Sequence, residues 1–249
     1  MRRVVPFLGI ALFVIAWQIA TWATHSTLVP GPVAAVAAIG ELARRGLLVK
    51  YIVASLFRVT WGYFGAVIVG IPAGVILGLW RNGEAAVNPF LQILRPISPL
   101  AWIPIAILWF GVGDVSAIFL IFLASLFPLV VTAMQAVHNI ESVHVRAGAN
   151  FGLTRAQLIR SVVLPAILPQ LIVGMRISLG IAWLVVVAAE MIAVNSGLGF
   201  LIIDARNAGN RYDLVVAGMI LIGAIGVVLD LVMRQAERLD FVRWGYASQ

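Results

Sequence analysis

The sequence has no cysteine, a single lysine and few charged residues of any kind. The absence of cysteine excludes disulfides and thiolate metal sites. Only 11% of the 249 residues are charged, whereas about a quarter are charged in an ordinary soluble domain. Hydrophobic residues make up 62% of the chain and its mean hydropathy is +1.06. Such a chain cannot cover its surface with polar groups, and we therefore expect a membrane protein that is solvated by lipid.

Motifs for nucleotide binding and hydrolysis are also absent. There is no G-x-x-x-x-G-K-[ST] phosphate loop, no G-x-S-x-G and no H-E-x-x-H. The three histidines are scattered along the sequence, which argues against a metal site: His25, His138 and His144. We therefore expect no enzymatic activity, no cofactor and no metal in this chain. Any energy that the protein needs for its function must then come from a partner or from a gradient.

The formal net charge of +7 allows two interpretations. A basic chain can bind nucleic acid, but no basic run here is longer than two residues and no aromatic-basic platform is visible. The alternative is the excess of arginine and lysine that membrane proteins keep in their cytoplasmic loops. We favour this second interpretation and expect contact with lipid and none with nucleic acid.

Long apolar segments predict an all-α polytopic protein with about six transmembrane helices, because about 20 apolar residues cross a bilayer. The first is too long for the apolar region of a cleaved signal peptide, so we expect residues 1–28 to form an N-terminal transmembrane helix and residues 29–249 one transmembrane domain. Residues 30–46 predict a short surface helix. The third segment is interrupted by Pro96, Pro99 and Pro104. The six segments are Val4–Ala23, Ile52–Trp80, Phe90–Gly111, Val115–Val137, Ala166–Val194 and Leu214–Met233.

The distribution of basic residues between the loops predicts the orientation. With both termini in the cytoplasm, ten cations lie on the inner side: Arg2, Arg3, Arg81, Arg95, Arg146, Arg155, Arg160, Arg234, Arg238 and Arg243. Five lie on the outer side: Arg44, Arg45, Lys50, Arg206 and Arg211. The positive-inside rule therefore favours cytoplasmic termini and a cytoplasmic loop at residues 138–165.

Gly70, Gly74 and Gly78 recur every four residues on one face of the second predicted span. Small residues at this spacing allow two helices to approach closely. The row is expected to serve either packing within the chain or contact with a second copy.

The loop between the fourth and fifth spans has the pattern of two short helices separated by a turn. Gly152 suits the end of the first helix, where a left-handed backbone is common. Thr154 and Gln157 have the spacing of a capping box, which can start a second helix. Leu164-Pro165 then predicts the beginning of the fifth span, since proline is tolerated in a first helical turn.

This segment resembles the conserved cytoplasmic loop of binding-protein-dependent ABC permeases. In that loop, a Glu-Ala-Ala triplet is followed after three residues by Gly. After nine further residues comes a β-branched residue with Leu-Pro. Here Arg146-Ala147-Gly148, Gly152, Val162 and Leu164-Pro165 occupy these places, with arginine for the glutamate and glycine for the second alanine. Other stretches are similar to the nitrate/sulfonate/taurine branch of the family: residues 55–58, 99–104, 109–113, 174–178 and 188–190.

The resemblance implies the fold of a type I ABC importer permease in a bacterial cytoplasmic membrane. Its partners would be a second permease copy, two ATPase subunits that bind ATP and Mg²⁺, and a periplasmic or lipid-anchored binding protein. The cargo would be a small anionic solute such as nitrate, bicarbonate, taurine or a sulfonate. The loop would be the coupling helix that is seated on the ATPase, through Arg146, Ala147, Gly148, Phe151, Gly152, Leu164 and Pro165.

Three ionisable residues fall within or near the predicted spans, where a charge costs roughly 2.5–3.5 kcal/mol on insertion scales. Arg176 and Glu190 cannot pair directly in a straight helix, because fourteen residues at ~1.5 Å each separate them by about 21 Å. Such groups either line an aqueous pathway or partner another span or subunit. The candidate pathway residues are Arg58, Arg176, Trp183 and Glu190.

Two other functions are compatible with an apolar helical chain. A secondary transporter or channel often has related halves and interrupted helices, and the proline-rich third segment could be such an interruption, although no matching segment is visible. A membrane subunit of a redox complex would need paired histidines within the spans for haem, which this sequence lacks.

Overall fold

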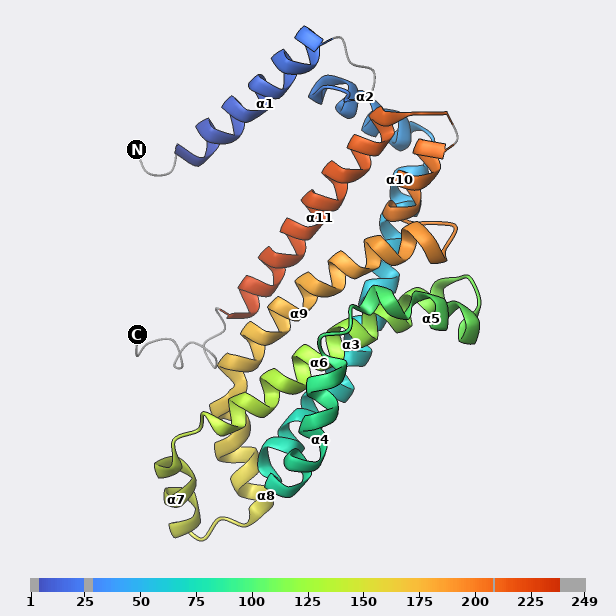
Figure 1. Ribbon diagram of the computed structural model, residues 1–249. Helices are drawn as coiled ribbons and strands as arrows, with labels where there is room; N and C mark the ends of the chain where they lie inside the picture. Colours follow the sequence, from blue (N-terminus) through green and yellow to red (C-terminus); the bar gives the residue numbers. More distant parts are fainter. Residues whose placement is uncertain (1–4, 25–28, 208, 238–249) are drawn as a thin grey trace.

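The computed structural model describes residues 5–24, 29–207 and 209–237, and within these ranges it contains helices and turns but no β-strand (Figure 1). The elements are α1 (Val5–Thr24), α2 (Pro32–Arg44), α3 (Leu47–Leu79), α4 (Arg81–Leu94), η1 (Pro99–Trp102), α5 (Ile103–Phe110), α6 (Asp114–His138), α7 (Ser142–Asn150), α8 (Arg155–Leu158), η2 (Ile159–Val163), α9 (Leu164–Ala193), α10 (Leu198–Asn207) and α11 (Tyr212–Glu237).

Four helical runs are long and apolar enough to cross a membrane. They are α3, α6, α11 and the continuous run Arg155–Ala193 that contains α8, η2 and α9. A bent pair of helices can supply a fifth span, and α1 is a shorter apolar helix over Leu8–Ala23. The all-helical membrane fold is confirmed, with four or five spans by length and composition where the sequence predicts about six.

The third predicted span is not a straight helix. The segment forms α4, then η1 with α5, and the two parts meet at an angle of 85°. Pro96 and Pro99 lie at this break, and a proline in a helix interior removes a backbone hydrogen bond and clashes with the preceding turn. The prolines that interrupt the apolar pattern therefore turn the chain sharply.

The core of the bundle lies among α3, α6 and α9, and the most extensive packing is between α3 and α6. Gly70, Gly74 and Gly78 all face α6: a Cβ atom on Gly70 would lie 3.2 Å from Cβ of Leu129, and one on Gly78 would lie 2.8 Å from Cβ of Val137. The glycine row therefore packs within the chain, where it lets the two backbones approach closely.

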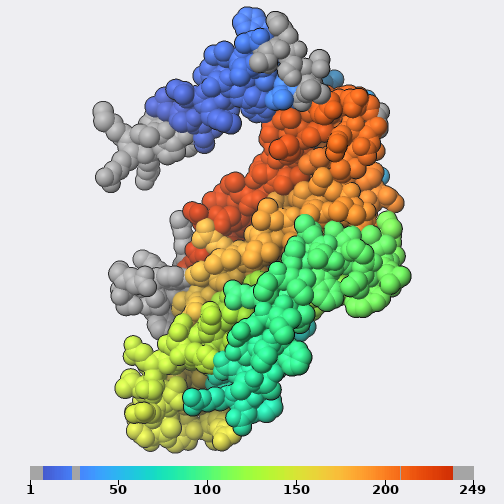
Figure 2. Space-filling model, in the orientation of Figure 1, coloured from blue at the N-terminus to red at the C-terminus, as the bar shows by residue number. Residues whose placement is uncertain are grey.

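The N-terminal helices are packed more loosely than this core. The helix α2 buries Ala35, Ala38 and Leu42, which lie on one face, and it packs against α11 and α3. Figure 2 shows α1 projecting away from the bundle, with its contact at the end beside α2. The side chains of Leu12 and Phe13 on α1 are accordingly exposed.

The two ends of the bundle carry different elements. Figure 1 shows α2 and the α10–α11 connection at one end, called the α2 end, and α7, α8 and the beginning of α4 at the other, called the α7 end. Within these elements, the basic residues of the predicted outer loops lie at the α2 end, and those of the predicted inner loops lie at the α7 end. Some predicted residues lie outside the described ranges: Arg2, Arg3, His25, Arg238 and Arg243.

Candidate functional site

The segment that resembles the coupling loop forms α7, a tight turn and α8. Gly152 has a φ of 74°, which glycine adopts without the strain that a side chain would bring. Its N–H donates to the carbonyl of Ala149 at 3.0 Å, and the N–H of Leu153 donates to the carbonyl of Gly148 at 3.2 Å. These two bonds form a Schellman motif at the end of α7, and they confirm the predicted role of Gly152 as a helix cap.

The capping box predicted at the beginning of α8 is present. The side chain of Thr154 accepts a hydrogen bond from the N–H of Gln157 at 3.4 Å, and the side chain of Gln157 accepts one from the N–H of Thr154 at 2.9 Å. Two backbone donors that a helix start leaves without partners are thereby satisfied. Local sequence alone therefore specifies this turn.

The predicted beginning of the fifth span at Leu164-Pro165 agrees with α9, which starts at Leu164 and has Pro165 in its first turn, but no break in the helix precedes it. The helix runs without interruption from Arg155 to Ala193 through η2, a π-helical segment of five residues. In it the N–H of Leu164 donates to the carbonyl of Ile159, five residues earlier. Proline lacks an N–H, and a π-turn is one of the local adjustments that carries a helix past it. The segment α8 is therefore a direct extension of the span α9.

Most of the predicted coupling residues are on the surface. Gly148 is buried, and a Cβ there would lie 2.6 Å from the side chain of Leu158 and 3.4 Å from that of Val162, so α7 packs closely on α8 and η2. Phe151 projects at the turn with 86% of its surface exposed. The remaining members are exposed as well: Arg146, Ala147, Gly152, Leu164 and Pro165.

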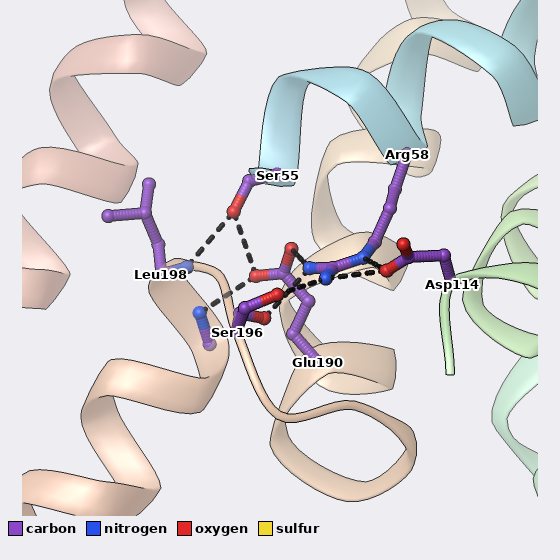
Figure 3. A network of polar contacts seen from close by, with 7 residues as sticks. Ser55, Arg58, Asp114, Glu190, Ser196 and Leu198 are labelled. Atoms are coloured by element: carbon purple, nitrogen blue, oxygen red, sulfur yellow. Dashed lines mark hydrogen bonds and ion pairs between the residues drawn. The ribbon is translucent and has the colours of Figure 1, made fainter. Parts of the chain in front are cut away.

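At the α2 end, Arg58 lies at the centre of a buried polar network (Figure 3). Its side chain on α3 is 2% exposed. Its Nη1 donates to Glu190 Oε1 at 2.6 Å and to the carbonyl of Ser196 at 2.8 Å, and its Nη2 donates to the hydroxyl of Ser196 at 2.5 Å. Its Nε donates to Asp114 Oδ1 at 2.8 Å. The guanidinium thus joins α3 to α6, to α9 and to the connection after α9.

Glu190 is fully buried and makes two further contacts besides Arg58. Its Oε2 accepts a hydrogen bond from the hydroxyl of Ser55 and another from the N–H of Gly199, each at 2.9 Å. Ser55 in turn accepts from the N–H of Leu198 at 2.9 Å, at the beginning of α10. Among the described residues no buried side-chain polar atom lacks a partner, so the cost of burying these charges is offset by hydrogen bonds.

The two ionisable residues of α9 have separate partners. Arg176 donates to Asp230 on α11 at 2.5 Å and contacts Glu237 at 3.2 Å. Trp183 is buried in the same interface, where its Nε1 donates to the carbonyl of Ile222 at 3.0 Å. The geometry gives Arg176 and Trp183 structural partners on α11 and gives Glu190 structural partners on α3 and α10.

Sequence reasoning missed several members of the network around Arg58. Ser55 precedes Arg58 by three residues and thus shares its helix face, a spacing that could have indicated a joint role. Asp114 and Ser196 are far from Arg58 in sequence, and only the packing of α6 and of the α9–α10 connection against α3 brings them within 3 Å of its guanidinium. No local pattern points to either residue.

The family described as "Binding-protein-dependent transport system inner membrane component" matches residues 70–239. The chain belongs to this family. It is 38% identical to the taurine transport system permease protein of Escherichia coli (strain K12), over 76% of this chain and 68% of that protein. It is 34% identical to the bicarbonate transport system permease protein of Synechococcus elongatus, over 94% and 87%. A putative aliphatic sulfonates transport permease protein of Bacillus subtilis is 33% identical, over 94% and 85%.

Solved structures of other ABC transporters share the fold of this inner membrane component. An inward-facing form of the MetNI methionine ABC transporter superposes with a TM-score of 0.69 at 21% identity, over 79% of this chain and 97% of that one. A bacterial alginate ABC transporter superposes with a TM-score of 0.61 at 16% identity, over 95% of both chains. These structures show the fold, and the family and the relatives identify the protein as the transmembrane permease subunit of an ABC importer.

Proposed function

We propose that this permease imports a small anion of the sulfonate, taurine, bicarbonate or nitrate class. It would work with a second permease copy, with two ATPase subunits that bind ATP and Mg²⁺, and with a periplasmic or lipid-anchored binding protein. The names of the relatives at 33–38% identity support this class of cargo. The α7–α8 segment supports the coupling to a separate ATPase.

The observation that carries this proposal is the connection of an exposed short helix to a long span. The helix α7 is fixed to α8 and η2 through Gly148, and α8 continues into α9 as one run of 39 residues. A push on α7 therefore moves α9 directly, without a flexible loop between them. An ATPase seated against the exposed turn at Phe151 could in this way change the position of α9 in the bundle.

The proposed coupling requires the α7 end to face the cytoplasm. The exposed cations Arg146, Arg155 and Arg160 at this end support such an orientation under the positive-inside rule. Both chain termini would then lie on the cytoplasmic side as well, and the α2 end would face outward, where a binding protein delivers its ligand.

Uptake by the reconstituted transporter tests the proposal against a secondary transporter or channel. The permease, co-expressed with its ATPase and binding protein, is placed in liposomes loaded with ATP and Mg²⁺, and uptake of labelled taurine, methanesulfonate, nitrate and bicarbonate is measured. We expect uptake of one of these anions that requires internal ATP and persists when ion gradients are collapsed. Uptake that follows an ion gradient and ignores ATP would contradict the proposal.

A matched pair of variants tests the coupling segment. Ala147→Glu places a charge on the exposed face of α7, and Ala37→Glu places the same charge on an exposed position of α2 at the opposite end. We expect Ala147→Glu to reduce both co-purification of the ATPase and ATP-dependent uptake, whereas Ala37→Glu should retain the ATPase. Equal retention of the ATPase by the two variants would refute the assignment of α7 as the coupling helix.

A further inference from the structure

A cleft of about 440 Å³ opens beside Arg58 at the α2 end. Its polar lining comes from Lys50, Arg58, Asp114 and Ser196, and Val49 and Phe57 supply part of its apolar wall. Lys50, the only lysine of the chain, is exposed. The cleft thus combines two cations with an apolar surface, which suits a small anion that carries a short apolar group.

The two carboxylates that pair with Arg58 are held very differently. Glu190 is 0% exposed and is fixed by Ser55 and by the N–H of Gly199. Asp114 is 55% exposed, and both of its contacts with Arg58 pass through the single oxygen Oδ1. Glu190 is therefore a permanent partner, whereas Asp114 can leave the guanidinium without exposing a buried charge to an apolar environment.

An anion could take the place of Asp114 by offering the guanidinium equivalent acceptors. Arg58 and Lys50 are the basic groups at the cleft, and Glu190 and Asp114 are the acidic ones. A monovalent oxyanion that replaces the Asp114 carboxylate on Arg58 presents the same kind of oxygen acceptors to the same N–H donors. The Asp114 side chain is already 55% exposed before it is released.

We propose that this cleft binds a small oxyanion, such as a sulfonate or carboxylate, which displaces Asp114 from Arg58 and is also held by Lys50. Asp114 acts as a built-in competitor that occupies the guanidinium when no ligand is present. Because Asp114 is the first residue of α6, its displacement removes the ion pair that ties the beginning of α6 to Arg58 on α3. This inference rests on the proposed function, because the bound anion would be the cargo and the α2 end, which contains the cleft, would face outward.

Binding of sodium methanesulfonate to the purified complex in detergent tests this site. The dissociation constant is obtained from the shift of the melting temperature, with sodium chloride at equal ionic strength as the reference. Asp114→Asn removes the competitor and should tighten binding roughly tenfold, the range of one charge-assisted hydrogen bond. Lys50→Gln should weaken it severalfold, and Lys50→Arg should restore it.

The matched control is Asp213→Asn, which removes a carboxylate that pairs with an arginine at the same end but outside the cleft. Its affinity for methanesulfonate should equal that of the wild type. If Asp114→Asn does not fold, the two Lys50 variants still decide the matter, because Lys50 is exposed. The inference is overturned if neither Asp114→Asn nor Lys50→Gln changes the affinity, or if tetramethylammonium binds in place of the anion.

Two further measurements are needed. One distinguishes a soluble anion from a lipid headgroup, and the other distinguishes failure of this cleft from failure of the proposed function. Phosphatidylglycerol carries an anionic headgroup, and a melting shift with this lipid but none with methanesulfonate would overturn a site for a soluble oxyanion. Wild-type uptake is measured in parallel. Normal ATP-dependent uptake with unchanged affinity in the variants refutes only this cleft, whereas absence of ATP-dependent uptake in the wild type refutes the proposed function itself.

Discussion

The two ends of the bundle are held together in different ways. At the α2 end, Arg58 and Glu190 are buried, and Glu190 is joined to Arg58 and to Ser55 by hydrogen bonds that span more than 100 positions of the sequence. At the α7 end, the turn at Gly152 and Thr154 is shaped by bonds between residues no more than five positions apart. One end therefore depends on tertiary packing, and the other is a local structure that presents an exposed surface.

This difference suits the division of work in the permease. A network that links α3, α6, α9 and the connection after α9 can hold the α2 end in one arrangement until a ligand changes it. A rigid exposed turn can receive a partner without rearranging the core. Substitutions at the α2 end should therefore act mainly on stability, and substitutions at the α7 end mainly on the coupling to ATP.

The largest effect is expected for Glu190→Ala. It leaves the buried Nη1 of Arg58 without its carboxylate, and breaking a buried pair from one side costs about 3–5 kcal/mol. The melting temperature of the purified permease measures the loss. Glu237→Ala is the control, because its contact with Arg176 is partly exposed, and it should lower the melting temperature much less. Equal losses would contradict the structural role of the network.

The next effect is expected for Gly74→Ala in the α3–α6 contact. A Cβ there would clash with the carbonyl of Val130 and with Ala133, and overpacking a close contact costs typically about 1–3 kcal/mol. Gly180→Ala is the control, since a Cβ on this α9 glycine meets no atom within 4 Å and alanine has the higher helix propensity. We expect opposite shifts of the melting temperature, and equal shifts would argue against close packing at Gly74.

A smaller and local effect is expected for Gly152→Ala. The positive φ of 74° costs an ordinary residue roughly 1–2 kcal/mol, so the turn after α7 should lose its shape while the bundle stays folded. ATP-dependent uptake should fall at an unchanged melting temperature. Gly152→Asn should keep more uptake, because asparagine tolerates this conformation better. A loss of uptake that accompanies global unfolding would contradict a local role.

The smallest effect is expected at Glu41 on α2. Its hydrogen bond with Arg211, at 2.7 Å, lowers the pKa of this carboxyl below the ordinary value of 4.5. A lowered pKa in the folded state means that the stabilisation is present above pH 4.5 and is lost as the pH falls through the lower folded value. Glu41→Gln should therefore flatten the acid side of the pH–stability curve slightly. The same exposed pair should weaken at high salt, and an unchanged curve would contradict its contribution.

Much of the fold could be predicted from the sequence, because lipid requires long apolar helices with internally satisfied backbones. The limits of the straight spans agree with the apolar segments within a few residues, as in α6, predicted at Val115–Val137 and found at Asp114–His138. The turn at Gly152 and Thr154 was predictable as well, because capping depends on neighbours in the sequence. The bend between α4 and α5 was signalled by its prolines, but its angle depends on packing.

The candidate sites were predictable to different degrees. The residues around Gly152 follow a local motif, whereas the partners of Arg58 and Glu190 do not. Asp114 and Ser196 belong to segments whose sequences contain no sign of a common site. The π-helical segment that precedes Pro165 was not predicted either.

The sequence by itself determined that this protein is a helical membrane chain with a locally specified turn between two of its spans. Hydropathy and capping act over a few neighbouring residues, so no tertiary contact is needed to fix them. Only the tertiary structure decided which charges meet. Ion pairing depends on distance in space, and the close packing of α3 against α6 and α9 sets the distances between Arg58, Asp114 and Glu190.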